Sequence, residues 1–124
     1  MPHIAAADAP TFEIPGATFT GLASPSRGSQ DNAVWRLTLH PGTPGMPHQV
    51  SREEIFVALS GRAIASLDGK NIDLNPGDAL VVPAFTDFSL ANASDMAFEA
   101  VVVLPAGARG IVEGAPPFVP PWAA

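Results

Sequence analysis

The chain has 124 residues and a formal net charge of -6 at pH 7, with six Lys and Arg residues against twelve Asp and Glu residues. This length suffices for one domain with a hydrophobic core, and no second block of composition marks another, so we expect a single domain over residues 1–124. The acidic balance leaves no cationic surface for phosphates and argues against nucleic acid as a partner. The chain contains no cysteine, which excludes disulfides and thiolate metal sites.

The sequence predicts neither a membrane segment nor a secretory signal. Its apolar runs, such as residues 97–104, end well short of the roughly 20 residues that a membrane-spanning helix needs. The N-terminal stretch MPHIAAADAP lacks a basic start followed by an apolar run of about 7–15 residues. We therefore expect a soluble, cytoplasmic protein with no membrane partner.

Proline and glycine punctuate the whole chain and favour an all-β fold. The 14 Pro and 11 Gly residues are too many for a helical domain, and they do not cluster in a low-complexity tract. Short alternating segments between these residues predict strands, in chain order, at 11–14, 17–23, 33–40, 55–60, 62–67, 71–74, 79–83, 88–91 and 96–104. This regular spacing is typical of a sandwich or a closed barrel.

The two ends of the chain differ from this central part. Residues 1–16 are predicted to be an N-terminal arm with one short edge strand, because prolines interrupt it. Residues 105–124 form a tail with five prolines together with Phe118 and Trp122. The tail is too apolar to be freely solvated, so it closes the mouth of the barrel over a ligand, crosses to a partner subunit, or covers the outside of its own sheet.

The predicted strand at 33–40 has two distinct faces. Trp35 and Leu37 lie on one face, and Arg36 lies on the other, as a period of two requires. The Asp68-Gly69 pair between two alternating segments predicts a tight hairpin, because both turn positions need a positive φ.

The stretch from 41 to 61, PGTPGMPHQVSREEIFVALSG, holds the most informative residues. A glycine-rich turn runs into a predicted alternating strand that opens with His48, carries Glu53 and Glu54, continues to Ser60 and stops at Gly61. On a regular strand His48 and Glu54 share one face, whereas Glu53 lies on the opposite face.

This region resembles the two motifs of the cupin family. The first motif is Gly, five residues, His, one residue, His, three or four residues, Glu, six residues, Gly, and the chain matches it at Gly42, His48, Glu54 and Gly61. The second is Gly, five residues, Pro, one residue, Gly, two residues, His, three residues, Asn, and the chain matches it at Gly77, Pro83 and Asn92. The resemblance implies a cupin jelly-roll β-barrel, with dimer packing that makes a homodimer the expected assembly.

The chain departs from the cupin pattern at the residues that bind metal. Family members that hold a metal typically use both His and the Glu of the first motif with the His of the second, and here Val50 and Phe88 replace two of these ligands. Phe85 replaces the Gly of the second motif. A divalent transition metal generally needs at least three protein ligands. We therefore expect no cofactor beyond a weakly held divalent metal on His48 and Glu54, with His40 as the best further donor.

The same replacements predict an apolar ligand site inside the barrel. A concave apolar pocket with a few polar groups is the usual form of a small-molecule site, and we expect it to be lined by Trp35, Arg36, Val50, Phe56, Phe85 and Phe88. Arg36 would anchor a carboxylate or phenolate if its face looked inward, although a strand arginine is more often exposed. His48 and Glu54 are the candidate catalytic pair, with Glu54 orienting the imidazole; the alternative is a vestigial polar pair whose members bond to each other.

Three functions remain open at this point. The leading one is a metal-independent cyclase, isomerase or dehydratase that acts on a small, largely apolar organic molecule. The second is a non-catalytic ligand-binding or sensor protein. The third is a metal-dependent cupin oxygenase or isomerase with an altered ligand set of His48, Glu54 and His40.

Overall fold

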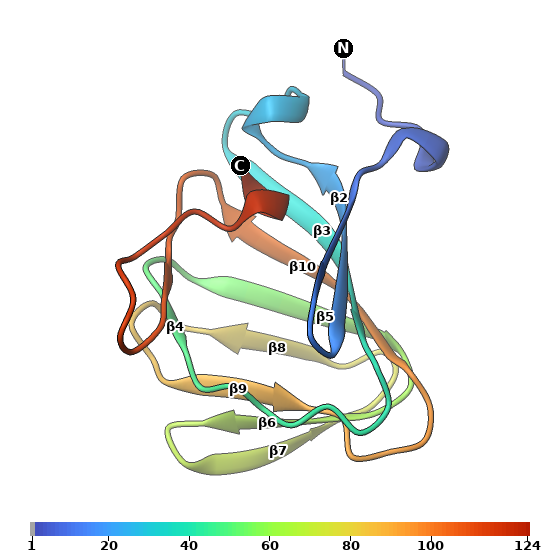
Figure 1. Ribbon diagram of the computed structural model, residues 1–124, viewed down its shortest axis with the longest axis vertical. Coiled ribbons are helices and arrows are strands. Elements are labelled where there is room, and N and C mark those ends of the chain that lie inside the picture. The colour runs from blue at the N-terminus through green and yellow to red at the C-terminus, as the bar shows by residue number, and fades with distance from the viewer. Residues whose placement is uncertain (1) are drawn as a thin grey trace.

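The computed structural model describes residues 2–124, and its regular secondary structure is almost entirely β-strand (Figure 1). In chain order the strands are β1 (Thr11–Ile14), β2 (Ala17–Ala23), β3 (Asn32–Leu39), β4 (Gln49–Val50), β5 (Glu54–Ser60), β6 (Ala63–Leu67), β7 (Lys70–Leu74), β8 (Ala79–Val82), β9 (Phe88–Ala91), β10 (Phe98–Pro105) and β11 (Gly110–Ile111). The helices are single 3-10 turns, η1 (Ala6–Asp8), η2 (Pro25–Arg27) and η3 (Pro121–Ala123). No helix in the described part of the chain is long and apolar enough to cross a membrane.

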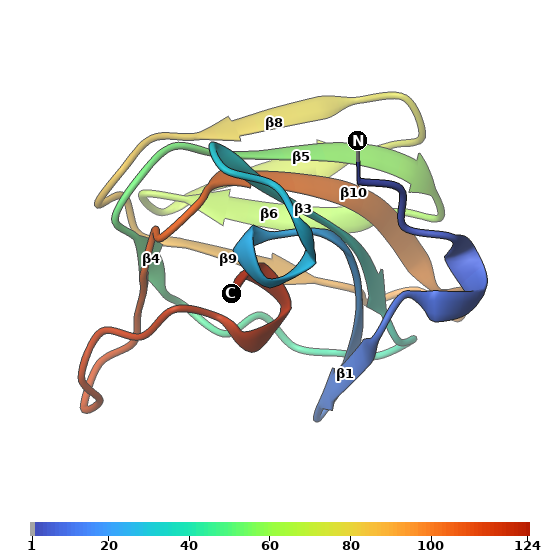
Figure 2. The ribbon, with the colours of Figure 1, turned by 90° about the horizontal axis from the view of Figure 1, so that it is seen from above.

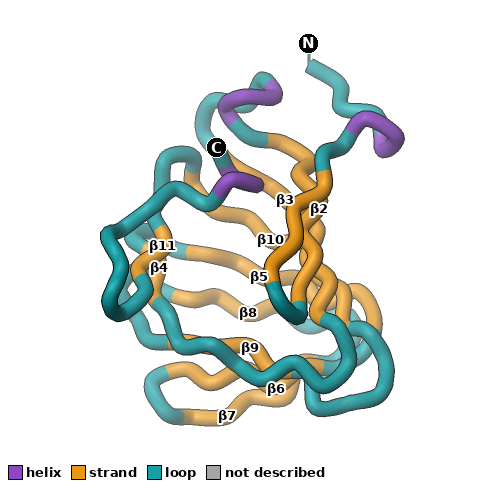
Figure 3. The backbone as a smooth tube through the Cα atoms, in the orientation of Figure 1, coloured by secondary structure: helices purple, strands orange, loops and turns teal. Residues whose placement is uncertain are grey.

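The strands form two facing layers of a jelly roll. The larger sheet has the order β1-β2-β3-β10-β5-β8, and its neighbouring strands are antiparallel. The smaller layer contains β7-β6-β9 and the short pair β11-β4. Isolated bridges from Thr43 to Asn92 and from His48 to Phe88 join the two parts, so the segment before β4 runs beside β9. Figure 2 and Figure 3 show how the strands of the two layers are arranged around the fold.

Alternating side chains fill the inside of this fold. In β3 and β10 every second residue is buried, including Trp35 and Leu37 of β3 and Val102 and Leu104 of β10. The two-residue period of these sequences puts the apolar side chains on the inner face and leaves Arg36 outside. The prediction of an all-β jelly roll from the spacing of strands and turns is therefore confirmed.

The predicted hairpin is also present. β6 and β7 pair from Ala63 opposite Leu74 to Leu67 opposite Lys70, and Asp68 and Gly69 connect them with φ of 48° and 82°. Both turn residues have the positive φ that a tight two-residue connection requires.

The predicted continuous strand from His48 to Ser60 is wrong, because it is broken at residues 51–53. β4 ends at Val50 and β5 begins at Glu54. The main chain of Ser51 donates to the Arg109 carbonyl, and the Ser51 hydroxyl accepts from the Arg109 amide. These bonds attach the break to the tail. Before the break, His48 pairs with Phe88 beside β9, and after it Glu54 pairs with Val82 in the larger sheet. His48 and Glu54 therefore belong to opposite layers of the fold.

Candidate functional site

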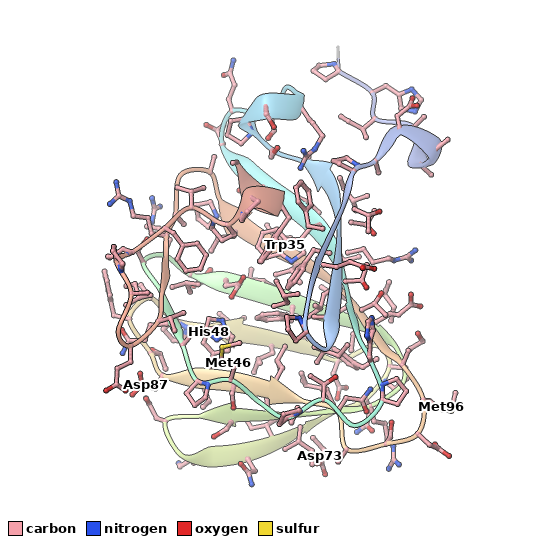
Figure 4. All side chains as sticks on the ribbon, viewed as in Figure 1. Trp35, Met46, His48, Asp73, Asp87 and Met96 are labelled. Carbon is pink, nitrogen blue, oxygen red and sulfur yellow. The ribbon has the colours of Figure 1, made fainter. Side chains whose placement is uncertain are left out.

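A cavity of about 210 Å³ lies between the two layers. Its walls come from the inner faces of β2, β3 and β5, from the segment 43–50, from β9 and from the tail. Besides the tryptophan rings, the polar side chains on its wall are Thr43, His48 and Glu54, and no Lys or Arg is among the lining residues. In Figure 4, Trp35 and His48 point into this space. The cavity is therefore apolar, with a small number of groups that can handle a proton.

His48 is held in place by main-chain and ring contacts. Its N–H donates to the Phe88 carbonyl at 2.9 Å, and the Phe88 N–H donates to the His48 carbonyl at 3.0 Å. The imidazole lies against the Phe88 ring with centroids 4.2 Å apart. Its Nδ1 lies 3.0 Å from the Met46 carbonyl oxygen. Because a carbonyl only accepts, Nδ1 carries the proton and Nε2 presents a lone pair.

The surroundings favour a neutral His48 ring. Burial lowers the pKa of His48 from its ordinary 6.5, and the hydrogen bond to the Met46 carbonyl opposes this shift only in part. At neutral pH the ring is therefore uncharged, and Nε2 is available as a base.

Glu54 is a buried carboxyl group, and no Lys or Arg of residues 2–124 lines the cavity beside it. It is the first residue of β5, pairs with Val82 of β8, and is only 4% exposed. Its Oε1 atom is buried and has no hydrogen-bond partner. Burial raises the pKa of Glu54 from 4.5 to about 8, so the group is mostly protonated at neutral pH. An unpaired buried polar atom costs about 1–3 kcal/mol, and this one belongs to a side chain that lines the cavity.

The expectation that Glu54 orients His48 is wrong. No hydrogen bond joins the two side chains in the described residues, and the Met46 carbonyl holds the imidazole instead. The physical reason is the strand break, which puts His48 beside β9 and Glu54 in the larger sheet. The two groups line the same cavity from different layers, so a ligand can lie between an acid and a base.

Four of the predicted ligand-binding residues line the cavity and two do not. Trp35, Val50, Phe56 and Phe88 are on its wall, and each is no more than 5% exposed. Arg36 is exposed, because it follows Trp35 on β3 and points to the opposite face of the sheet. An anchoring role for Arg36 inside the cavity is thus excluded by its position.

Phe85 also lies outside the cavity. It adopts a positive φ of 58°, its N–H donates to the Val50 carbonyl, and its ring is 64% exposed. The backbone keeps the left-handed conformation that favours the Gly of the cupin motif, and the side chain lies at the surface. Predicting Phe85 as a ligand contact was therefore wrong.

Two polar side chains at the edges of the barrel, His40 and Asp87, are engaged in other contacts. His40 is exposed, and its Nε2 lies 3.0 Å from the Thr18 hydroxyl, so it does not join His48 and Glu54. The Asp87 carboxylate accepts from the Gln49 side chain at 2.7 Å and sits at the outer edge of the molecule in Figure 4.

The sequence did not identify the contribution of the tail to the cavity residue by residue. Val112, Phe118, Pro120 and Trp122 all line the cavity. The Trp122 ring stacks on Phe19 with centroids 3.6 Å apart and an interplanar angle of 5°. Of the three alternatives for the tail, the structure fits the one in which it closes the barrel of its own chain. The apolar residues between the prolines are the signal that pointed to packing.

The donor set does not fit the metal centre that the cupin resemblance implies. Among residues 2–124, no three His, Cys, Asp or Glu side chains come together in a group able to hold a metal ion. Val50 and Phe88 occupy the cavity wall beside His48 and offer no donor atom. Two ligands fall short of the three or more that tight sites use.

Comparison with known proteins agrees with this architecture. The model of the cupin domain family matches residues 35–104, which is more than half of the chain. A curated relative, beta-conglycinin beta subunit 1 of Glycine max, is 34% identical over 70 residues, or 53% of this chain. This chain spans only 16% of the length of that relative.

Two solved structures share the fold at low sequence identity. The polyketide cyclase RemF from Streptomyces resistomycificus superposes with a TM-score of 0.80 at 16% identity, covering 94% of this chain and 87% of that one. Salicylate 1,2-dioxygenase from Pseudoaminobacter salicylatoxidans, solved with gentisate adducts, gives a TM-score of 0.71 at 20% identity, covering 86% of this chain and 31% of that one. By its two motifs, its jelly roll and the matching family model, this chain belongs to the cupin family.

Proposed function

We propose that this protein binds a small, uncharged, largely apolar organic molecule in the cavity and catalyses a metal-independent proton transfer on it, as in a cyclisation, isomerisation or dehydration. The observation that carries the proposal is the buried Glu54 carboxyl group, which lines the same cavity as His48 and whose Oε1 has no hydrogen-bond partner among residues 2–124. A carboxylic acid and a free imidazole nitrogen on opposite layers are the two groups that such a reaction needs.

The character of the wall supports an uncharged ligand. No Lys or Arg lines the cavity, so an anion would find no counter-charge there, and burying an unpaired charge is costly. An apolar cavity of about 150 Å³ is known to hold benzene. The present volume of about 210 Å³ therefore suits a molecule of one or two rings.

The chemistry follows from the protonation states. His48 Nε2 takes a proton from the carbon next to a ligand carbonyl, and the electron pair of that C–H bond forms the double bond of an enol. The carbonyl oxygen receives the proton of the Glu54 carboxyl group. The raised pKa of Glu54 and the lowered pKa of His48 place the acid and the base in the correct states near neutral pH. When His48 and Glu54 exchange these protons back, both groups return to their neutral states.

The fold comparisons support a reaction on a small organic molecule but do not decide which reaction it is. One structure of similar fold is called a polyketide cyclase, and another was solved with gentisate adducts. At 16% and 20% identity the likeness extends to the fold and carries no residue assignments.

Deuterium exchange tests the catalytic part of the proposal. We expect the protein to accelerate exchange of the α-protons of 2-tetralone in D₂O, followed by NMR, because enolisation needs only one base and one acid. His48→Ala and Glu54→Gln should each lower the acceleration at least tenfold, within the typical range for loss of a general acid or base. Arg36→Ala is the matched control and should exchange like the wild type.

Ligand binding without exchange would identify a non-catalytic binding protein instead. Binding is measured with a matched pair, 2-acetylnaphthalene and 2-naphthoate, by quenching of the tryptophan fluorescence. The ketone should bind at least tenfold more tightly than the carboxylate, since the cavity holds no cation. Tighter binding of 2-naphthoate would contradict an uncharged ligand.

A further inference from the structure

The segment around η2 forms hydrogen bonds with the end of the tail. The Ser24 and Ser26 hydroxyls each donate to the Ala124 main-chain oxygen at 2.6 Å, and the Ser26 N–H donates to the same atom at 3.4 Å. Ser24 is fully buried. In Figure 2, η2 and η3 lie next to each other, as these bonds require.

Arg27 adds a contact that reaches closer to the cavity. Its Nη2 donates to the Trp122 carbonyl at 3.0 Å, while its Nε is buried without a partner. The Arg27 side chain therefore binds one main-chain oxygen of η3 through Nη2 while its Nε stays without a hydrogen bond. Such a bond from a charged donor contributes more than a bond between neutral groups.

Gly21 provides the space for this contact. A Cβ atom added at Gly21 would clash with the Arg27 guanidinium, coming within 2.8 Å of its Cζ. Gly21 has no positive φ that would forbid a side chain, so its role is steric. Because the clashing atoms are at the far end of a flexible side chain, Gly21→Ala should displace the guanidinium without disrupting the sheet.

The residue held by this contact is part of the cavity wall. Trp122 stacks on Phe19 and meets Trp35 edge-on, with centroids 6.5 Å apart. All three rings line the cavity. The position of the Trp122 ring thus defines one end of the space available to a ligand.

We infer that Arg27, passing over Gly21 to the Trp122 carbonyl, is a positioning residue that fixes the aromatic wall of the cavity and thereby sets ligand affinity. Arg27 acts through Trp122, because its own guanidinium does not line the cavity. The affinity part rests on the proposed ligand-binding function, whereas the structural part, the fixing of η3, does not.

Hydrogen exchange of the tail, followed by mass spectrometry, tests the structural part. The Ala123 amide, which donates to the Pro120 carbonyl at 2.9 Å, reports on η3. In both Arg27→Ala and Gly21→Ala we expect it to exchange about tenfold faster than in the wild type, as loss of one charged hydrogen bond implies. Adding Gly21→Ala to Arg27→Ala should change nothing further, because the clashing group is already gone.

The same variants test the affinity part with 2-acetylnaphthalene. Its Kd should rise about tenfold in Arg27→Ala and in Gly21→Ala, stay unchanged in the exposed control Arg36→Ala, and recover in part in Arg27→Lys, which keeps a charged donor. Unchanged exchange of Ala123 in Arg27→Ala would overturn the inference even if the ligand binds. If exchange accelerates while the wild type binds no ketone, the proposed function fails and the fixing of η3 stands.

Discussion

At the scale of single residues, Glu54 couples the chemistry of the cavity to the stability of the fold. The carboxyl group gains no compensating partner for its desolvation, and burial raises its pKa from 4.5 to about 8. The folded state therefore prefers the protonated group, and the unfolded state prefers the ionised group at neutral pH. The stability that Glu54 contributes is complete below pH 4.5 and is lost as the pH rises to about 8.

The pH dependence of unfolding checks this consequence. Between pH 6.5 and 8 we expect the free energy of unfolding of the wild type to fall by about 2 kcal/mol, measured by urea titration at each pH. Glu54→Gln should remove this slope, since the amide does not ionise. His48→Ala should keep it, because the lowered pKa of His48 affects stability only at lower pH. An equal slope in Glu54→Gln and the wild type would assign the effect to another group.

Phe85 is a second residue that we expect to lower the stability of the fold measurably. Its positive φ of 58° is unfavourable for a side chain with a Cβ, and its exposed ring buries little in return. We expect Phe85→Gly to stabilise the fold by about 1 kcal/mol in chemical denaturation. Phe85→Ala, which keeps the Cβ, should give no such gain. A Phe85→Gly variant less stable than Phe85→Ala would mean that the ring makes a contact that matters.

At the scale of elements, alternation predicted most strands, because it reports which face of a strand is buried. It also placed Trp35 and Arg36 on opposite faces, so it already implied that only one of them could line the cavity. The break at residues 51–53 escaped prediction, since no Gly or Pro marks it. Its cause is pairing of β4 with β11 in the tail, a tertiary contact that a local pattern does not contain.

The comparison with the cupin motifs predicted which sequence positions surround the cavity better than it predicted which side chains contact a ligand. It placed His48, Val50, Glu54 and Phe88 around one space, and the structure brings all four to the cavity wall. It misplaced Phe85, because the motif Gly is conformational and its side-chain direction cannot be inferred from spacing. The absence of tight metal binding remains a prediction that rests on the number of donors.

Restoring a donor on β4 tests that prediction. We expect the wild type, purified without an affinity tag, to retain less than stoichiometric iron, manganese, zinc or nickel by elemental analysis. Val50→His should bind Zn²⁺ at least tenfold more tightly in calorimetry, because the introduced imidazole would add a third donor to His48 and Glu54, which line the same cavity. Val50→His combined with Glu54→Gln is the control and should lose the gain. Stoichiometric metal on the wild type through His48 would support the metal-dependent alternative.

At the scale of the whole molecule, the outer face of the larger sheet carries an apolar patch over β5, β8 and part of β10. Val57 is paired with Val101 of β10, and Ile55 with Val81 of β8. Val57 is 36% exposed and Val81 is 50% exposed. β8 is also an edge of the sheet in the described residues. Contiguous apolar surface beside a free strand edge is typical of an interface between subunits.

The homodimer implied by the cupin resemblance is predicted to use this face. Light scattering coupled to size-exclusion chromatography should give a dimer for the wild type and a monomer for the Val57→Lys/Val81→Lys variant, because buried unpaired charges oppose association. Thr38→Lys, on the outer face of β3 away from these valines, is the control and should stay dimeric. A monomeric wild type at micromolar concentrations would contradict the prediction.

A ¹³C NMR titration of the Glu54 carboxyl carbon tests most directly whether a neutral Glu54 in the apolar cavity meets an uncharged ligand. The resonance, assigned by its loss in Glu54→Gln, should titrate with a midpoint near 8, as burial dictates. Saturating 2-acetylnaphthalene should raise the midpoint further, because a ligand carbonyl accepts a hydrogen bond only from the protonated acid. A midpoint near 4.5 that the ketone leaves unchanged would contradict the account.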